Sequence, residues 1–89
     1  MRRNKLELIY DILTIVRKHN NSIKPTPLLR YSNLSSSSFT EYFKELLGKE
    51  LIKEIKDKSG RKHITLTDKG FRYLEKYKMI LGFINEFEL

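Results

Sequence analysis

One stretch, Ser35-Ser-Ser-Ser-Phe-Thr-Glu-Tyr-Phe-Lys-Glu-Leu-Leu-Gly48, predicts a helix with an apolar underside and a polar outer side. Phe39, Phe43 and Leu46 recur at i, i+4 and i+7, so at about 100° per residue they share one face. The opposite face carries Ser37, Thr40, Glu41 and Lys44. Small hydroxyl groups let another surface approach closely, and a nucleic-acid groove is one such surface. A serine run more often marks only a helix cap and a solvated first turn. The neighbouring segments therefore have to distinguish these two interpretations.

The composition is that of one small domain with a basic surface. The chain has 89 residues, and its 18 Lys and Arg against 11 Asp and Glu give a net charge of +7, which favours a polyanionic partner. Without cysteine there is no disulfide and no thiolate metal site. No apolar run is long enough to cross a membrane, and the N-terminus leads into a charged amphipathic segment instead of a signal sequence. We therefore expect a cytoplasmic protein that binds no membrane.

A first helix is predicted from about Asn4 to Lys18, and Asn20-Asn21-Ser22 ends it with turn residues. Its apolar residues form stripes on two faces, one with Leu6, Ile9, Tyr10, Leu13 and Val16 and the other with Leu8, Ile12 and Ile15. Two apolar faces require two neighbours. In so short a chain, the second neighbour is either the C-terminal helix or another subunit.

A second, short helix is expected after a proline-rich turn. Ile23 precedes Lys24-Pro25, and the residue before a proline is extended, so only a very short strand fits here. Thr26 then has the chemistry of an N-cap. Pro27 fits the first helical position, where its missing N–H is harmless.

This short helix is predicted to end at a tight turn and to be followed by the serine-rich helix. Ser32-Asn33 ends the short helix, because asparagine tolerates a left-handed conformation, and Leu34 anchors the turn in the core. Ser35 is expected to cap the next helix, and Gly48 is expected at its C-cap. The spacing is typical of a helix-turn-helix.

Residues 51–56 and 62–66 predict two strands, and Asp57-Lys58-Ser59-Gly60-Arg61 predicts the hairpin tip between them. From Lys53 to Lys62 there are five basic and two acidic residues. A basic hairpin tip is usually a solvated loop. Beside a helix-turn-helix, however, it has the position and charge of a wing, whose ligands would be phosphates.

The last helix is predicted from the N-cap Thr67 to about Phe87. One apolar stripe contains Phe71, Leu74 and Leu81, while a second steps by 4, 3, 4 and 3 as in a coiled-coil seam and contains Tyr73, Tyr77, Ile80, Ile84 and Phe87. Met79 and Phe83 make the distal end apolar almost all round. We expect this second stripe to form a homodimer interface, with folding back onto the first helix as the alternative. Residues 1–66 would then form the main domain and residues 67–89 the dimerisation helix.

Three motifs carry a family resemblance: Tyr31-Ser-Asn-Leu-Ser35, Tyr42-Phe-Lys-Glu-Leu-Leu-Gly-Lys-Glu-Leu-Ile52 and Ile64-Thr-Leu-Thr-Asp-Lys-Gly70. With the order of elements, they resemble the small archaeal winged helix-turn-helix DNA-binding proteins, including the ten-kilodalton chromatin-associated kind. The resemblance covers nearly the whole chain. It implies an α+β fold, mainly α with a small β-hairpin, whose C-terminal helices pair as an antiparallel coiled coil.

The chain departs from that family at two places. Where such proteins often carry a Thr-Arg pair, it has Pro25-Thr26-Pro27. Its last helix also ends early, at Leu89, which implies a shorter or differently packed dimer.

These features predict a transcriptional regulator or chromatin-associated protein that binds double-stranded DNA as a homodimer. Helix 35–48 would lie in the major groove and the wing 56–62 on the backbone. The expected DNA contacts are Ser36, Ser37, Ser38, Thr40 and Lys44 on the helix, Lys56, Lys58, Arg61 and Lys62 on the wing, Arg30 near the turn, and Arg2, Arg3 and Lys5 as a second arm. Glu41, Glu45 and Glu50 offset Lys44 and Lys49 on the helix, so most affinity should come from the wing and base readout should be weak or context-dependent.

We expect no enzyme, cofactor or metal ion. His19 and His63 lie at a helix end and in a hairpin strand, without a nucleophile or ligand cluster at suitable spacing, and are expected to be solvated. The main alternative is a winged helix that binds another protein in a transcription assembly, which needs no basic wing. An effector-sensing repressor is a third possibility.

Overall fold

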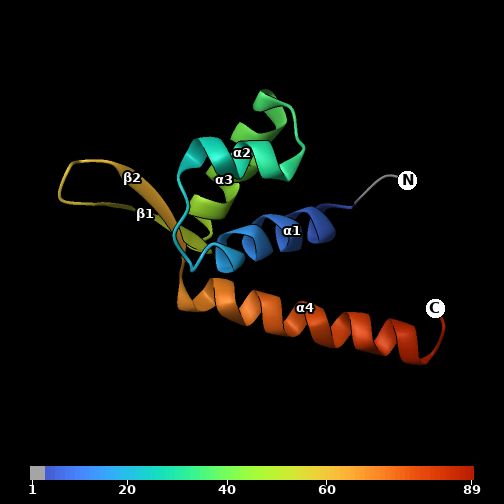
Figure 1. Ribbon diagram of the computed structural model, residues 1–89. Helices are drawn as coiled ribbons and strands as arrows, with labels where there is room; N and C mark the ends of the chain where they lie inside the picture. Colours follow the sequence, from blue (N-terminus) through green and yellow to red (C-terminus); the bar gives the residue numbers. More distant parts are fainter. Residues whose placement is uncertain (1–3) are drawn as a thin grey trace.

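Six elements follow one another along residues 4–89, the part of the chain that the computed structural model describes. They are α1 (Lys5–Lys18), α2 (Pro25–Ser32), α3 (Ser36–Gly48), β1 (Ile52–Lys56), β2 (Lys62–Leu66) and α4 (Asp68–Glu86). Helices α1 to α3 form a head from which the hairpin projects, and α4 runs beside α1 and extends beyond it (Figure 1). The expected fold, mainly α with one small hairpin, is confirmed.

The hairpin is antiparallel, with Ile52 opposite Leu66 and Lys56 opposite Lys62. On the other side of β2, Ile23 forms the short strand expected from the sequence. Its N–H donates to the Ile64 carbonyl at 3.1 Å, and the Ile64 N–H donates back at 2.7 Å. The loop before α2 is therefore attached to β2.

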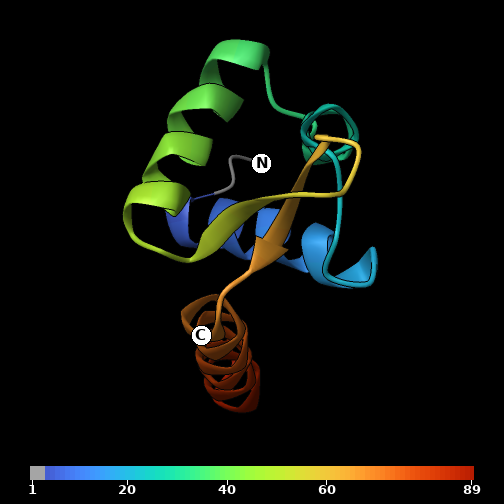
Figure 2. The ribbon, with the colours of Figure 1, turned by 90° about the vertical axis from the view of Figure 1, so that its left-hand side faces the viewer.

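The core lies around α1, which contacts α2, β2 and α4. Viewed from the wing side, α2 and α3 lie above α1 and the base of the hairpin, while α4 lies below (Figure 2). The largest fully buried side chains are Ile12, Leu13, Val16, Leu28, Leu46, Ile52, Ile64 and Leu74. Because they come from every helix and both strands, one small core holds α3 and the hairpin in fixed relation.

Part of the first apolar face of α1, at Leu6 and Tyr10, is covered by α4 of the same chain. Tyr73 donates its hydroxyl hydrogen to the Leu6 carbonyl at 2.7 Å, and the rings of Tyr10 and Tyr77 stack with centroids 4.6 Å apart. Burial in this contact is the largest cause of the raised pKa of both Tyr73 and Tyr77. The proximal part of the predicted seam thus contacts α1.

Helix α2 begins two residues earlier than predicted, so assigning Thr26 as N-cap and Pro27 as first helical residue was wrong. Lys24 is the N-cap in an extended conformation, and Pro25 occupies the first turn. The rule that places proline at a helix start fits Pro25 as well as Pro27, because neither early position needs an N–H. The expected left-handed residue after the helix is confirmed, since Asn33 has φ 59°.

The C-cap expected at Gly48 was also wrong. Gly48 is still helical, Lys49 is the C-cap, and the left-handed residue is Glu50 at φ 58°. The Leu51 N–H donates to the Leu46 carbonyl at 3.0 Å, and the Glu50 N–H donates to the Leu47 carbonyl at 3.1 Å. This pair of bonds is a Schellman closure, and burial of Leu51 outweighs the glycine preference at the left-handed position.

Candidate nucleic-acid interface

Helix α3 presents a polar stripe on the side that faces away from the core. Phe39 and Leu46 are buried, and Ser35 caps the helix by accepting a hydrogen bond from the Ser38 N–H at 3.2 Å. Residues at i, i+4, i+7 and i+11 share the opposite side. This outer stripe consists of Ser37, Glu41, Lys44 and Gly48, all of which are exposed.

The predicted hydroxyl contacts of α3 lie at its start, and two of the four, Ser37 and Thr40, form hydrogen bonds at the start of the helix. Ser36 and Thr40 are exposed and Ser38 is half-buried. The Thr40 hydroxyl donates to the Ser36 carbonyl at 2.8 Å, and the hydroxyls of Ser35 and Ser37 lie 3.4 Å apart. These groups order the first turns, which agrees with the cap interpretation of the serine run.

Glu45, one of the three acids expected to weaken DNA binding, is paired with two lysines. Its carboxylate lies 2.7 Å from the Lys5 ammonium and 2.8 Å from that of Lys49. Hydrogen bonds from Lys49 and Lys5 hold the pKa of Glu45 below its usual value. Lys5, expected as part of a DNA-binding arm, forms an ion pair with this carboxylate. Among the described residues, Glu41 and Lys44 have no such partner.

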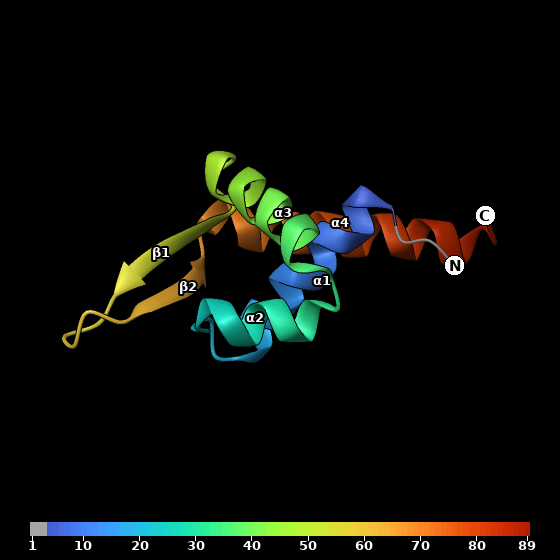
Figure 3. The same cartoon turned by 90° about the horizontal axis from the view of Figure 1, so that it is seen from above.

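The predicted wing cations lie on the hairpin, which projects away from the head at the end opposite the free end of α4 (Figure 3). Lys56, Lys58, Arg61 and Lys62 are all exposed. Lys62 lies 3.7 Å from the Glu54 carboxylate, a distance at which an exposed pair contributes little. Within residues 4–89 the other three cations form no ion pair, so their charges are available to a ligand.

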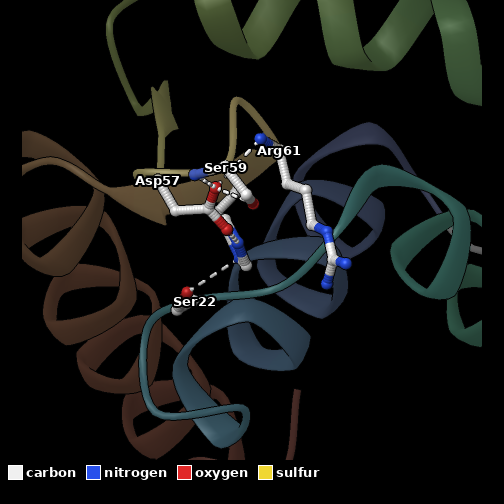
Figure 4. Close-up of polar contacts among 5 residues, drawn as sticks. Ser22, Asp57, Ser59 and Arg61 are labelled. Atoms are coloured by element: carbon white, nitrogen blue, oxygen red, sulfur yellow. Dashed lines mark hydrogen bonds and ion pairs between the residues drawn. The ribbon is translucent and has the colours of Figure 1, made fainter.

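The tip of the wing is ordered by Asp57 (Figure 4). Its Oδ1 accepts hydrogen bonds from the Ser59 hydroxyl at 2.6 Å, the Ser59 N–H at 2.9 Å and the Arg61 N–H at 3.0 Å. These bonds, that of the Ser59 hydroxyl first, hold the pKa of Asp57 far below its usual range. Sequence reasoning missed this role, although an Asp at the start of a turn is the signal of an Asx turn, in which its side chain binds the backbone two residues on.

His63 is half-buried and bonded, so expecting it to be solvated was wrong. Its Nε2 lies 3.1 Å from Oδ2 of Asp57, and its Nδ1 lies 3.3 Å from the hydroxyl of Ser22. Ser22 is brought here because the adjacent Ile23 pairs with Ile64, the residue after His63. The contact connects the wing tip to the loop before α2.

The other predicted residues are spread over the molecule. Arg30 is exposed on α2, whereas Arg2 and Arg3 lie outside the described residues. Of the predicted dimer residues, Ile80 and Phe87 are exposed and Ile84 is half-buried, while Tyr73 and Tyr77 contact α1.

No three His, Asp or Glu side chains in residues 4–89 are grouped so that they could hold a metal ion. None of the helices in that range is long and apolar enough to cross a membrane.

Solved structures of two DNA-binding proteins have a fold similar to that of this chain. Sso10a-2 of Sulfolobus solfataricus, a DNA-binding protein, superposes with a TM-score of 0.75 at 16% identity, covering 97% of this chain and 86% of its own. F93 from STIV, a winged-helix DNA-binding protein, has a TM-score of 0.75 at 16% identity, covering 89% and 91% respectively. No curated protein matches the sequence of this chain.

At 16% identity, these two likenesses show the fold alone. For the fold, they confirm the resemblance to small archaeal winged-helix proteins. A family model described as winged helix-turn-helix matches residues 2–84, which include α2, α3 and the hairpin. The chain therefore belongs to the winged helix-turn-helix family.

Proposed function

We propose that this protein binds duplex DNA, with α3 in the major groove and the wing on the phosphate backbone. The observation that carries the proposal is that α3 has an exposed polar stripe and that the hairpin next to it carries four exposed cations, three of which form no ion pair among residues 4–89. A major groove admits a helix, and exposed lysines and arginines bind phosphates. The two structural neighbours, which are DNA-binding proteins, support the same function.

Most of the affinity is assigned to the wing. Lys56, Lys58 and Arg61 form no ion pair within the described part of the chain, whereas the outer stripe of α3 carries one acid and one base. Binding should therefore depend steeply on salt and only weakly on sequence. In this proposal the protein is a non-enzymatic regulator or chromatin-associated protein of the cytoplasm, associated with the nucleoid.

A homodimer through the distal part of α4 completes the proposal. Met79, Phe83 and Phe87 are 66%, 56% and 57% exposed, although each is a large apolar side chain. Contiguous exposed apolar surface of this kind is typical of an interface. Since Tyr73 and Tyr77 already contact α1, the contact with a second chain would centre on Ile80 and the residues that follow it.

The proposed wing contact is tested by replacing Arg61 and Lys62 with alanine. The double variant should bind every duplex more weakly, and the slope of log affinity against log salt should fall by about one unit per lost phosphate contact. Titrations with random and AT-rich duplexes at several salt concentrations would measure both quantities.

The matched control replaces Arg72 and Lys78, two exposed cations of α4, by alanine and removes the same charge. If both double variants lose affinity equally, net charge and not the wing explains the binding. Absence of duplex binding by the unaltered protein at low salt would contradict the proposal and favour a protein-interaction module.

A further inference from the structure

The outer stripe of α3 is the starting point, and the inference rests on the proposed DNA-binding function. Ser37, Glu41, Lys44 and Gly48 follow one line along the helix, opposite buried Phe39 and Leu46. In a helix laid in a groove, side chains on that line face the base edges, while those on the flanks face the two phosphate walls.

Two of the small hydroxyl groups around this line are already engaged. Thr40 donates its hydroxyl hydrogen to the Ser36 carbonyl, and the Ser37 hydroxyl lies beside that of Ser35. The longer polar side chains of the line are Glu41 and Lys44. Both are exposed, and neither forms an ion pair within residues 4–89.

Glu45 provides the contrast. It lies one turn beyond Glu41, turned toward α1, and its carboxylate is bound by Lys5 and Lys49. The two acids of this helix thus differ. Glu45 is paired with two ammonium groups, whereas Glu41 lies on the outer line and has no ion-pair partner among the described residues. A free carboxylate on a helix proposed to approach DNA costs affinity unless a donor meets it.

Gly48 adds a second, independent observation. A Cβ atom at this position would meet no heavy atom within 4 Å, and the left-handed conformation after the helix belongs to Glu50. Neither packing nor backbone conformation requires the glycine, which lowers helix stability by about 1 kcal/mol relative to alanine. Its effect is to remove a side chain from the end of the outer line, so another surface can come close.

The chemistry of the major groove identifies what Glu41 would meet. A carboxylate only accepts hydrogen bonds, and the N4 amino group of cytosine is the donor that Glu typically binds. Lysine donates to O6 and N7 of guanine. Three residues along a helix rise by about 4.5 Å, close to the ~3.4 Å between stacked bases, so positions 41 and 44 can reach neighbouring base pairs.

We infer that Glu41 and Lys44 are the base-reading residues of α3, with Glu41 selecting cytosine and Lys44 selecting guanine in a neighbouring base pair. Repulsion between the Glu41 carboxylate and phosphate disfavours binding in other registers. Sequence preference is therefore confined to two neighbouring base pairs, and its contribution adds to a larger nonspecific affinity.

The test is selection from a random duplex library by the full chain and three variants. The unaltered protein should enrich a C·G pair at one position, with a discrimination of about 5- to 150-fold, as for a good side-chain to base contact. Glu41→Gln should move the preference at that position to adenine, because an amide binds adenine N6 and N7. Glu41→Ala should abolish the preference and tighten binding to unrelated duplexes.

Glu45→Gln is the matched control, since it removes the same charge from the same helix off the outer line. It should leave the selected base unchanged. Identical selections by the unaltered protein and Glu41→Gln, with duplex binding intact, would overturn the inference and leave the proposed function standing. Failure of the unaltered protein to bind any duplex at low salt would overturn both.

Discussion

At the wing tip, one carboxylate receives three hydrogen bonds from the four residues that follow it. Asp57 closes the turn through Ser59 and Arg61, and Gly60 supplies the positive φ of 84° that the turn needs. The exposed cations on either side of this turn therefore belong to an ordered loop. Ordering before binding reduces the entropy lost when a ligand is bound.

This carboxylate should make stability depend on pH. Its pKa is lower in the folded chain than the ~3.9 of an unfolded Asp, so its contribution is fully present above about pH 4 and is lost as the pH falls through the folded value. Asp57→Ala should lower the free energy of unfolding near neutral pH, and its difference from the unaltered protein should shrink in acid. Urea unfolding at several pH values would measure this.

Asp57→Asn is the control for that experiment. An amide oxygen can still accept from the Ser59 and Arg61 N–H groups, but the charge beside His63 is lost. The free energy of unfolding of this variant should lie between those of the alanine variant and the unaltered protein. A stability difference that stays constant across this pH range would contradict the role given to the carboxylate.

The residue pattern predicted the exposed side of α3 correctly, because helical periodicity alone separates Glu41 and Lys44 from Phe39 and Leu46. It could not predict the link from Asp57 through His63 to Ser22. These three residues meet only because of the hairpin register and the pairing of Ile23 with Ile64, both of which depend on tertiary packing.

At the scale of elements, the join between α3, β1 and α4 depends on a close approach at Gly70. A Cβ atom there would collide with the carbonyl oxygen of Leu51, in the turn that closes α3. Thr67, the N-cap of α4, donates its N–H to the same carbonyl at 3.2 Å. Gly70, which ends the third stretch that carries the family resemblance, thus lets α4 begin directly against the base of the hairpin.

Gly70→Ala should therefore destabilise the fold by about 1–3 kcal/mol, the usual effect of overpacking a tight contact. Gly82→Ala in the same helix is the control, because a Cβ atom there meets no heavy atom within 4 Å. It should stabilise the chain by about 0.5–1 kcal/mol. Thermal or urea unfolding should show a loss of stability for Gly70→Ala and a gain for Gly82→Ala. Equal changes in stability for the two variants would refute the close approach at Gly70.

Element boundaries were less predictable than the elements themselves. Two prolines in one turn gave two possible starts for α2. At the end of α3 the glycine predicted the C-cap at Gly48, whereas the left-handed residue is Glu50. At the end of α3 the outcome depends on Leu51, which is buried in the core. Local preferences are smaller than the free energy of burying a leucine, about 1.5–3 kcal/mol.

At the scale of the whole molecule, the described chain is elongated, with extents of 50 × 27 × 21 Å. The length comes from the hairpin at one end and the distal turns of α4 at the other (Figure 3). A heptad pattern could not show which helix covers the predicted seam. The structure places Tyr73 and Tyr77 against α1 and leaves Ile80, Phe83 and Phe87 exposed.

If the distal turns of α4 form the proposed dimer, sedimentation should give twice the 10.7 kDa chain mass. Replacing Ile80 and Phe83 by glutamate should yield a monomer with the same fold, because both side chains are exposed within the chain. Lys78→Glu, on the other side of the helix, should remain dimeric. A monomeric mass for the unaltered protein would refute the dimer.

The hairpin leaves one edge of its sheet open, since within residues 4–89 β1 pairs only with β2. Such an edge is a template for a strand of another molecule and a common start of aggregation. On β1, however, Lys53, Glu54 and Lys56 make three of the five residues charged, and all are exposed. When many copies crowd together, these charges resist the joining of hairpins into a larger sheet, so the basic surface proposed to attract phosphate also keeps neighbouring molecules apart.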